Sequence, residues 1–161
     1  MKKINLKFPE FDLAVNTARL RMAVSIASNR RFGAQTGNRN WVQRHNDEVI
    51  GACGEIAVAK LGKFYFVPGL NEFHSVPDVF RDVEVRSTAN EHGMLVVRDN
   101  DVLERRFVLA IVRGSAVVLA GWIYGTEGAK SEYLGNPNNN TPAWFIPINK
   151  LRPMETFNVE A

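Results

Sequence analysis

The helix-forming and strand-forming segments of this chain lie in separate parts of the sequence. Apolar residues recur at helical spacing through residues 12–31 and again through residues 46–61. Beyond Gly62 the apolar segments are short and rich in β-branched and aromatic residues, as expected of strands at 64–67, 76–87, 94–97, 106–112 and 115–124. This order predicts an α+β fold, in which N-terminal helices are followed by a mainly antiparallel mixed sheet.

Turn residues divide the strand-forming part. Gly114 and Ser115 are expected to form a hairpin turn. Residues 126–133 are typical of a short helix, and residues 143–151 of a closing strand or extended segment.

The length of the chain predicts one domain. A chain of 161 residues, of which 45% are hydrophobic, can bury one substantial core. We expect a single domain over residues 1–161, with a basic helical part at about 1–45, a core at about 46–125, and a C-terminal loop and strand at 126–161.

Several classes of protein are excluded by composition. No apolar run is long enough to span a membrane, and the basic N-terminus lacks the apolar stretch of a secretory signal, so we expect a cytoplasmic protein. Cys53 is the one cysteine, which excludes an internal disulfide. The three histidines, His45, His74 and His92, are too widely spaced to indicate a zinc site. A bound metal would therefore have oxygen ligands.

Arginines are concentrated in a segment that contains no acidic residue. Residues 13–46 include no Asp or Glu and six arginines: Arg19, Arg21, Arg30, Arg31, Arg39 and Arg44. Guanidinium groups bind phosphate in a bidentate manner, so this block predicts a face that binds nucleic acid. A solvated basic surface explains it equally well.

The segment VPDVFRDVEVRST, residues 76–88, carries charges on one face of a strand. Side chains alternate along a strand, so Val83 and Val85 are expected to face the core, while Glu84 and Arg86 share the other face. Directly opposed residues of an antiparallel pair lie on one face. A two-residue turn would place Asp78 and Glu84 on opposite faces; a three-residue turn over residues 80–82, with Asp82 left-handed, pairs them directly.

Two opposed carboxylates repel each other unless a cation lies between them. Mg²⁺ takes carboxylate oxygens and keeps several waters, so Asp78 and Glu84 with solvent and a phosphate would complete its coordination. Arg86 points to the same side and would hold a phosphate or the attacking water. The alternative is an exposed hairpin face with an ordinary Glu84–Arg86 charge pattern.

The second helix carries an acidic residue in an apolar setting. In HNDEVIGACGEIAVAKLG, Glu55 lies among alanines and aliphatic residues, with Glu48 on the same face, and Gly51 and Gly54 would let the helix approach the sheet closely. A partly buried Glu needs a cation or a partner. Glu55 would either join the metal site or pair with Lys60 or an arginine.

Asp99 and Asp101 in VRDND are either ligands of a metal ion or part of an ordinary turn.

GACGEIAVAKLG with Glu55, PDVF with Asp78, and VEVRST with Glu84 and Arg86 together resemble the motifs of the PD-(D/E)XK nucleases, over roughly residues 46–125. The chain also resembles small uncharacterised phage-encoded members with an EVR motif. The resemblance implies a restriction-endonuclease-like core and hydrolysis of DNA phosphodiester bonds with Mg²⁺ or Mn²⁺. It makes Asp78, Glu84 and Glu55 the metal ligands and adds Arg86 to the catalytic residues, where the family usually has Lys.

Two functions follow from the residues and the resemblance. The first is a metal-dependent DNA nuclease, in the host cytoplasm if the chain is phage-encoded. The second is a catalytically inactive protein of the same fold that binds nucleic acid or another protein. DNA is the expected partner, no membrane is expected, and homodimer formation stays open.

Overall fold

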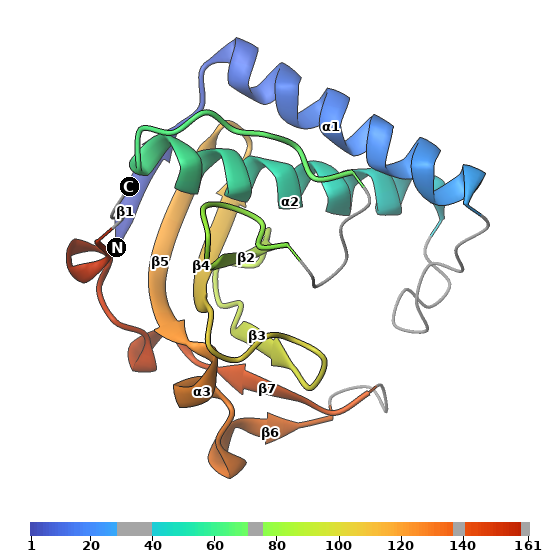
Figure 1. Cartoon of the computed structure of the whole chain (residues 1–161). Coiled ribbons are helices and arrows are strands. Elements are labelled where there is room, and N and C mark those ends of the chain that lie inside the picture. The colour runs from blue at the N-terminus through green and yellow to red at the C-terminus, as the bar shows by residue number, and fades with distance from the viewer. Residues whose placement is uncertain (29–39, 71–75, 137–140, 159–161) are drawn as a thin grey trace.

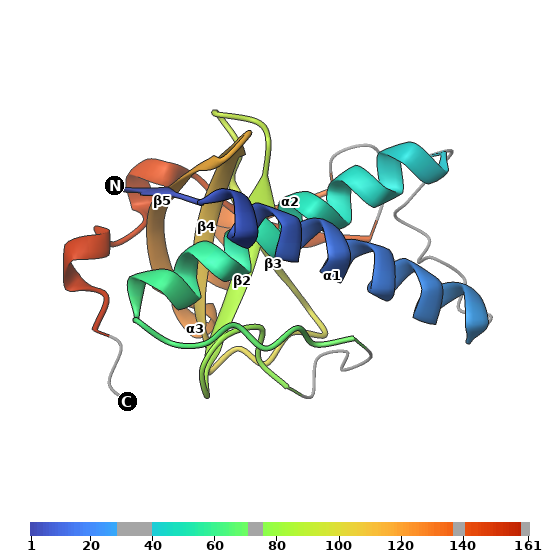
Figure 2. The same ribbon diagram turned by 90° about the horizontal axis from the view of Figure 1, so that it is seen from above.

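Figure 1 shows the computed structural model, which describes residues 1–28, 40–70, 76–136 and 141–158. Helices α1 (Phe8–Ala27) and α2 (Trp41–Leu61) cover one face of a four-stranded sheet. A second, three-stranded sheet lies on the other side, at the bottom of Figure 1. Seen from above in Figure 2, the two helices lie next to each other over the strands. The chain is thus layered as helices, mixed sheet and antiparallel sheet.

The larger sheet has the order β1-β5-β4-β2. Its strands are β1 (Lys2–Asn5), β5 (Ala116–Tyr124), β4 (Arg106–Arg113) and β2 (Val83–Thr88). Neighbours are antiparallel except β2 and β4, which run parallel with Glu84 beside Phe107 and Arg86 beside Leu109. Because β2 is an edge strand, one side of its backbone is open to other segments.

The smaller sheet has the order β3-β7-β6, and all of its pairs are antiparallel. Its strands are β3 (Leu95–Arg98), β7 (Ala143–Ile146) and β6 (Leu134–Gly135). The remaining elements are a single helical turn, α3 (Gly125–Gly128), and 3₁₀ turns at Ser131–Tyr133, Ile148–Lys150 and Met154–Thr156.

Alternation along β4 supplies both hydrophobic cores. Val108 and Ala110 pack with α2 in the first core, between the helices and the larger sheet. Phe107 and Leu109 point the other way and pack with the smaller sheet in the second core. Since β4 is an inner strand buried on both faces, its sequence RFVLAIVR is apolar throughout its centre. The predicted α+β architecture, with mixed and antiparallel sheets, is confirmed.

Helix α2 begins earlier than predicted, at Trp41 instead of residue 46. The Asn40 side chain accepts a hydrogen bond from the Gln43 N–H at 2.9 Å, and the Gln43 side chain accepts one from the Asn40 N–H at 3.0 Å. This reciprocal cap satisfies two backbone donors at the start of the helix. Glu48 therefore lies two turns into α2.

Gly54 brings α2 into close contact with β2. A Cβ atom added at Gly54 would overlap the Ser87 Oγ and lie 3.0 Å from the Ala110 Cβ. Gly51 differs, because a Cβ atom there would meet nothing within 4 Å. The expected role of a glycine in close packing is thus confirmed for Gly54 and is wrong for Gly51.

Residues 64–67 were predicted as a strand but form an irregular segment along the end of α2. Phe64 packs edge-on against Phe80, with ring centroids 4.2 Å apart, and Phe66 packs on the first core. Tyr65 and Val67 point to solvent. Packed residues do alternate with exposed ones, but no strand among the described residues pairs with this backbone, so the predicted strand is wrong.

Three other expectations need adjustment. Helix α1 spans Phe8–Ala27, four residues earlier at its start than predicted, because the Glu10 carboxylate accepts the Lys7 N–H at 2.5 Å and caps the helix there. Residues 2–5, which belong to the part expected to be basic and helical, form strand β1 and pair with β5. Residues 143–151 form β7 followed by a 3₁₀ turn. In the described part of the chain, no helix is both long and apolar enough to cross a membrane.

Candidate functional site

The turn before β2 has the length that places Asp78 and Glu84 together. Val79 and Val83 form an antiparallel bridge, and their N–H groups and carbonyls exchange hydrogen bonds of 3.1 and 3.2 Å. Three residues, Phe80 to Asp82, form this turn, so of the two predicted alternatives the three-residue turn is the one observed. The left-handed residue, however, is Phe80, with φ of 59°, instead of Asp82. Packing of the Phe80 ring against Phe64 holds that residue in place.

Asp78 occupies the open edge of β2. Its carboxylate accepts a hydrogen bond of 2.8 Å from the backbone N–H of Val85. The Asp82 carbonyl, just before β2, accepts a hydrogen bond from the Arg106 N–H, so the backbone groups of even-numbered residues here point toward β4. The N–H of Val85 therefore points away from β4 and would have no strand partner without Asp78. Among the described residues, Asp78 has no ion pair.

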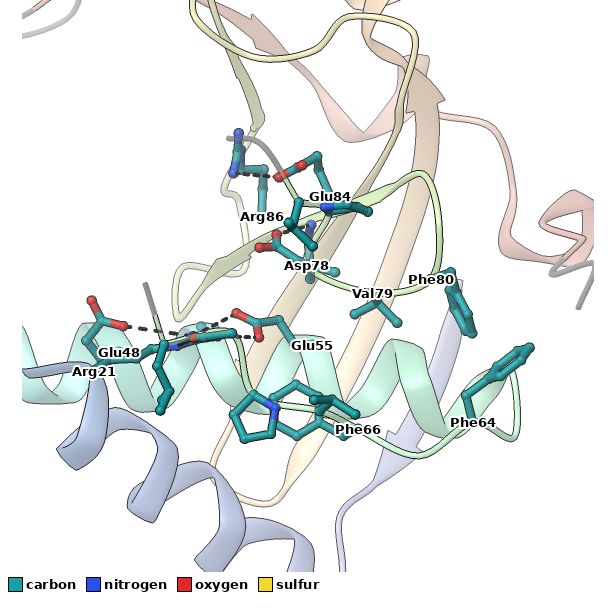
Figure 3. Close-up of a pocket in the computed structure, with 18 of the residues that line it drawn as sticks. Arg21, Glu48, Glu55, Phe64, Phe66, Asp78, Val79, Phe80, Glu84 and Arg86 are labelled. Carbon is teal, nitrogen blue, oxygen red and sulfur yellow. Dashed lines mark hydrogen bonds and ion pairs between the residues drawn. The ribbon is translucent and has the colours of Figure 1, made fainter. Parts of the chain in front are cut away.

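Asp78 lies between Glu55 and Glu84 in a cleft of about 780 Å³. Figure 3 shows Glu55 projecting from α2 on one side of Asp78 and Glu84 from β2 on the other. The cleft is also lined by Arg21, Arg86 and the segment from Phe64 to Leu70. The three predicted acidic residues, from three different segments of the chain, are thus brought to one place.

Glu55 is paired with an arginine. Arg21, from α1, donates to both carboxylate oxygens of Glu55, at 2.9 and 2.7 Å, and its Nε donates to the Gly69 carbonyl at 2.9 Å. Burial raises the pKa of Glu55 to about 7, with Asp78 and Glu48 adding to the rise and Arg21 opposing it. The alternative of an arginine partner is the one that the structure contains, and Lys60 pairs instead with Glu10.

Glu84 is also held by arginines. Its carboxylate accepts a hydrogen bond of 2.5 Å from Arg105 and lies 3.7 Å from Arg86. Burial raises the pKa of Glu84, and the nearby charge of Asp78 raises it further, while the two arginines lower it. The charged face predicted for β2 is therefore a buried ionic cluster instead of a solvated hairpin face.

Arg86 binds the two sheets together. Its Nε donates to the Val96 carbonyl at 3.1 Å, its Nη2 donates to Asp101 at 2.6 Å, and its guanidinium lies 5.3 Å from the centre of the Phe107 ring. Asp101 is buried and also accepts the Arg98 N–H at 2.8 Å. Of the two expectations for Asp101, the turn is the one observed.

The acidic residues share a cleft without being gathered around one point. In the described part of the chain, no group of three or more potential ligands is close enough to hold one metal ion. Glu55 uses both oxygens on Arg21, whereas Asp78 uses one oxygen on a backbone N–H. Carboxylate oxygens are the ligands that hard cations take, and Asp78 keeps one oxygen free of hydrogen bonds with the described residues.

Arg98 is the cleft residue that sequence reasoning missed. It ends β3 and lines the cleft with Asp78 and Arg86. Its side chain is partly buried, and among the described residues its guanidinium has neither an ion pair nor a hydrogen-bond partner. The sequence shows Arg98 within the charged segment VRDND. It does not show how the strands are arranged, and that arrangement places Arg98 in the same cleft as Arg86.

The predicted nucleic-acid-binding arginines divide into three groups. Arg30, Arg31 and Arg39 lie outside the described residues. Arg21 lines the cleft and is paired with Glu55, as described above. Arg19 is exposed on α1, and Arg44 lies over the Trp41 ring, 5.7 Å from its centre. Binding of nucleic acid by this block stays a prediction.

Comparison with models of known protein families, with curated proteins and with solved structures finds no match for this chain.

Proposed function

We propose that this protein is a metal-dependent nuclease, with a restriction-endonuclease-like core, that hydrolyses DNA phosphodiester bonds in the cleft around Asp78. The observation that supports this function most is the position of the partly buried Asp78 between the buried Glu55 and Glu84. Burial raises the pKa of both Glu55 and Glu84, and the charge of Asp78 raises both further. Repulsion among three carboxylates in one cleft is relieved when a divalent cation binds there.

Asp78 and Glu84 are the proposed ligands of the cation, Mg²⁺ or Mn²⁺. A bound divalent cation supplies Lewis acidity and lowers the pKa of a coordinated water. In this proposal Glu84, besides holding the cation, would accept the proton of the attacking water. A guanidinium group does not act as a base, so the proposed role of Arg86 is to orient or stabilise a phosphate. Glu55 and Arg21 together complete the wall of the cleft.

The test is cleavage of single-stranded, duplex and branched DNA in Mg²⁺ and in Mn²⁺, with EDTA as the control. The sharpest variant is Asp78→Asn, because the amide oxygen can still accept the Val85 N–H while the negative charge is lost. We expect its cleavage rate to fall by at least about a hundredfold, as for loss of a metal ligand. Asp12→Asn, an exposed change on α1, is the matched control and should cleave as wild type does.

A second function is favoured by the arginine pairing of the acidic residues. Glu55 is paired with Arg21, and Glu84 with Arg105. A metal ion would have to compete with these ion pairs, whereas a protein that only binds nucleic acid could keep them. If the purified protein binds DNA but cleaves none of these substrates in either metal, the binding function replaces the nuclease. Cleavage by wild type that persists in Asp78→Asn would place the active site elsewhere.

A further inference from the structure

The Arg98 side chain makes no ion pair and no hydrogen bond with the described part of the chain. Its guanidinium lines the cleft and is partly buried. The other two arginines that line the cleft differ from it, since Arg21 is paired with Glu55 and Arg86 with Asp101. A partly buried cation without a counterion is costly, so its retention here calls for a ligand.

Asp101, the acidic residue whose charge acts on Arg98, is already used by other groups. Asp101 accepts hydrogen bonds on its Oδ2 from the Arg86 Nη2, at 2.6 Å, and from the backbone N–H of Arg98, at 2.8 Å. The same carboxylate therefore fixes the backbone of Arg98 and the side chain of Arg86. Arg86 and Arg98 both line the cleft, so two guanidinium groups from β2 and β3 face the same space.

The two arginines destabilise each other when no anion is present. Burial lowers the pKa of Arg98, the charge of Arg86 lowers it further, and Asp101 offsets part of this effect. A guanidinium group offers planar, fork-shaped donors that match phosphate oxygens. An anion with several oxygens that enters the cleft would contact Arg98 and relieve its repulsion with Arg86.

We propose that Arg98, beside Arg86, forms a phosphate-binding subsite in the cleft, and that the phosphate it binds belongs to the backbone of a nucleic-acid strand lying across Asp78. The choice of nucleic acid as the source of the phosphate rests on the proposed function. The subsite itself rests on the unpaired guanidinium and stands whether or not the strand is cut. The subsite would hold one phosphate and so position the strand in the cleft. It would make no contribution to sequence specificity, because it does not contact the bases.

The first test measures binding of a labelled single-stranded and a labelled duplex oligonucleotide in EDTA, so that no strand is cut. Arg98→Gln should weaken binding about tenfold and reduce the salt dependence by about one counterion, as expected for loss of one phosphate contact. Arg98→Lys should retain part of the affinity, because it keeps the charge but loses the fork. Arg113→Gln, an exposed change on the β4–β5 hairpin outside the cleft, is the matched control.

A stability measurement separates a binding residue from a structural one. Because Arg98 has no partner in the described residues, Arg98→Gln without ligand should melt at the same temperature as wild type or higher. Inorganic phosphate should raise the melting temperature of wild type and have a smaller effect on Arg98→Gln. A rise with inorganic phosphate but no oligonucleotide binding would assign the subsite to free phosphate and overturn its nucleic-acid source.

Two results would overturn the subsite altogether. One is equal oligonucleotide affinity and equal salt dependence for wild type and Arg98→Gln. The other is a wild type that binds neither oligonucleotide nor inorganic phosphate. Cleavage activity is not read in any of these measurements, so a protein that cuts nothing can still confirm the subsite, and a protein that cuts DNA can still overturn it.

Discussion

Arg21 of α1 donates to both carboxylate oxygens of Glu55 of α2, at 2.9 and 2.7 Å, beneath the cleft. Burial nevertheless raises the pKa of Glu55 from 4.5 to about 7. An acid whose pKa is raised in the folded state holds its proton more tightly there than in the unfolded chain. Its favourable contribution is therefore complete below pH 4.5 and is lost as the pH rises to about 7.

Glu55→Gln tests this pH dependence, because the amide does not titrate. Between pH 4.5 and 7.5, the free energy of unfolding of wild type should fall relative to that of Glu55→Gln by about 3 kcal/mol, the value of a shift of this size. Urea unfolding at several pH values measures the difference between the two proteins. A difference that stays constant, or that changes in favour of wild type, would mean that the ionised pair with Arg21 is the preferred state throughout this range.

The two glycines of α2 provide a second, matched prediction. Gly54→Ala places a methyl group against Ser87 and Ala110, so α2 must move away from β2, and we expect a loss of about 1–3 kcal/mol. Gly51→Ala meets open space in the same helix and should stabilise the fold by about 1 kcal/mol. Urea unfolding of both variants checks the pair. Equal effects of the two substitutions would show that close packing does not distinguish these positions.

The parts of the site that could be predicted from the sequence are those set by local geometry. Strand alternation placed Val83 and Val85 in the first core, and both are buried there. The three-residue turn was one of two registers that the residues allowed, and it is the one found. Helical spacing put Glu55 in an apolar setting, where it is buried.

The partners of the acidic residues could not be predicted, because they come from distant parts of the chain. Arg105 reaches Glu84 only because β4 runs parallel to β2, and a single sequence does not reveal strand order. Arg21 was assigned to a surface that binds nucleic acid, but packing of α1 on α2 directs it to Glu55. Arg98 was missed for the same reason, since its position depends on how β3 meets β2.

Asp78 and Glu84 should differ in what their neutral amides do to the fold. Glu84→Gln leaves Arg105 and Arg86 facing an uncharged group in a largely buried setting, so we expect a loss of about 1–3 kcal/mol in the free energy of unfolding. Asp78→Asn keeps an acceptor for the Val85 N–H and removes a charge that repels Glu55 and Glu84, so its stability should equal or exceed that of wild type. Urea unfolding in EDTA compares the two variants without metal. A loss in Asp78→Asn as large as that in Glu84→Gln would mean that the negative charge of Asp78 is itself needed to hold the turn before β2. In that case loss of cleavage in Asp78→Asn could not be assigned to the chemistry of the cleft.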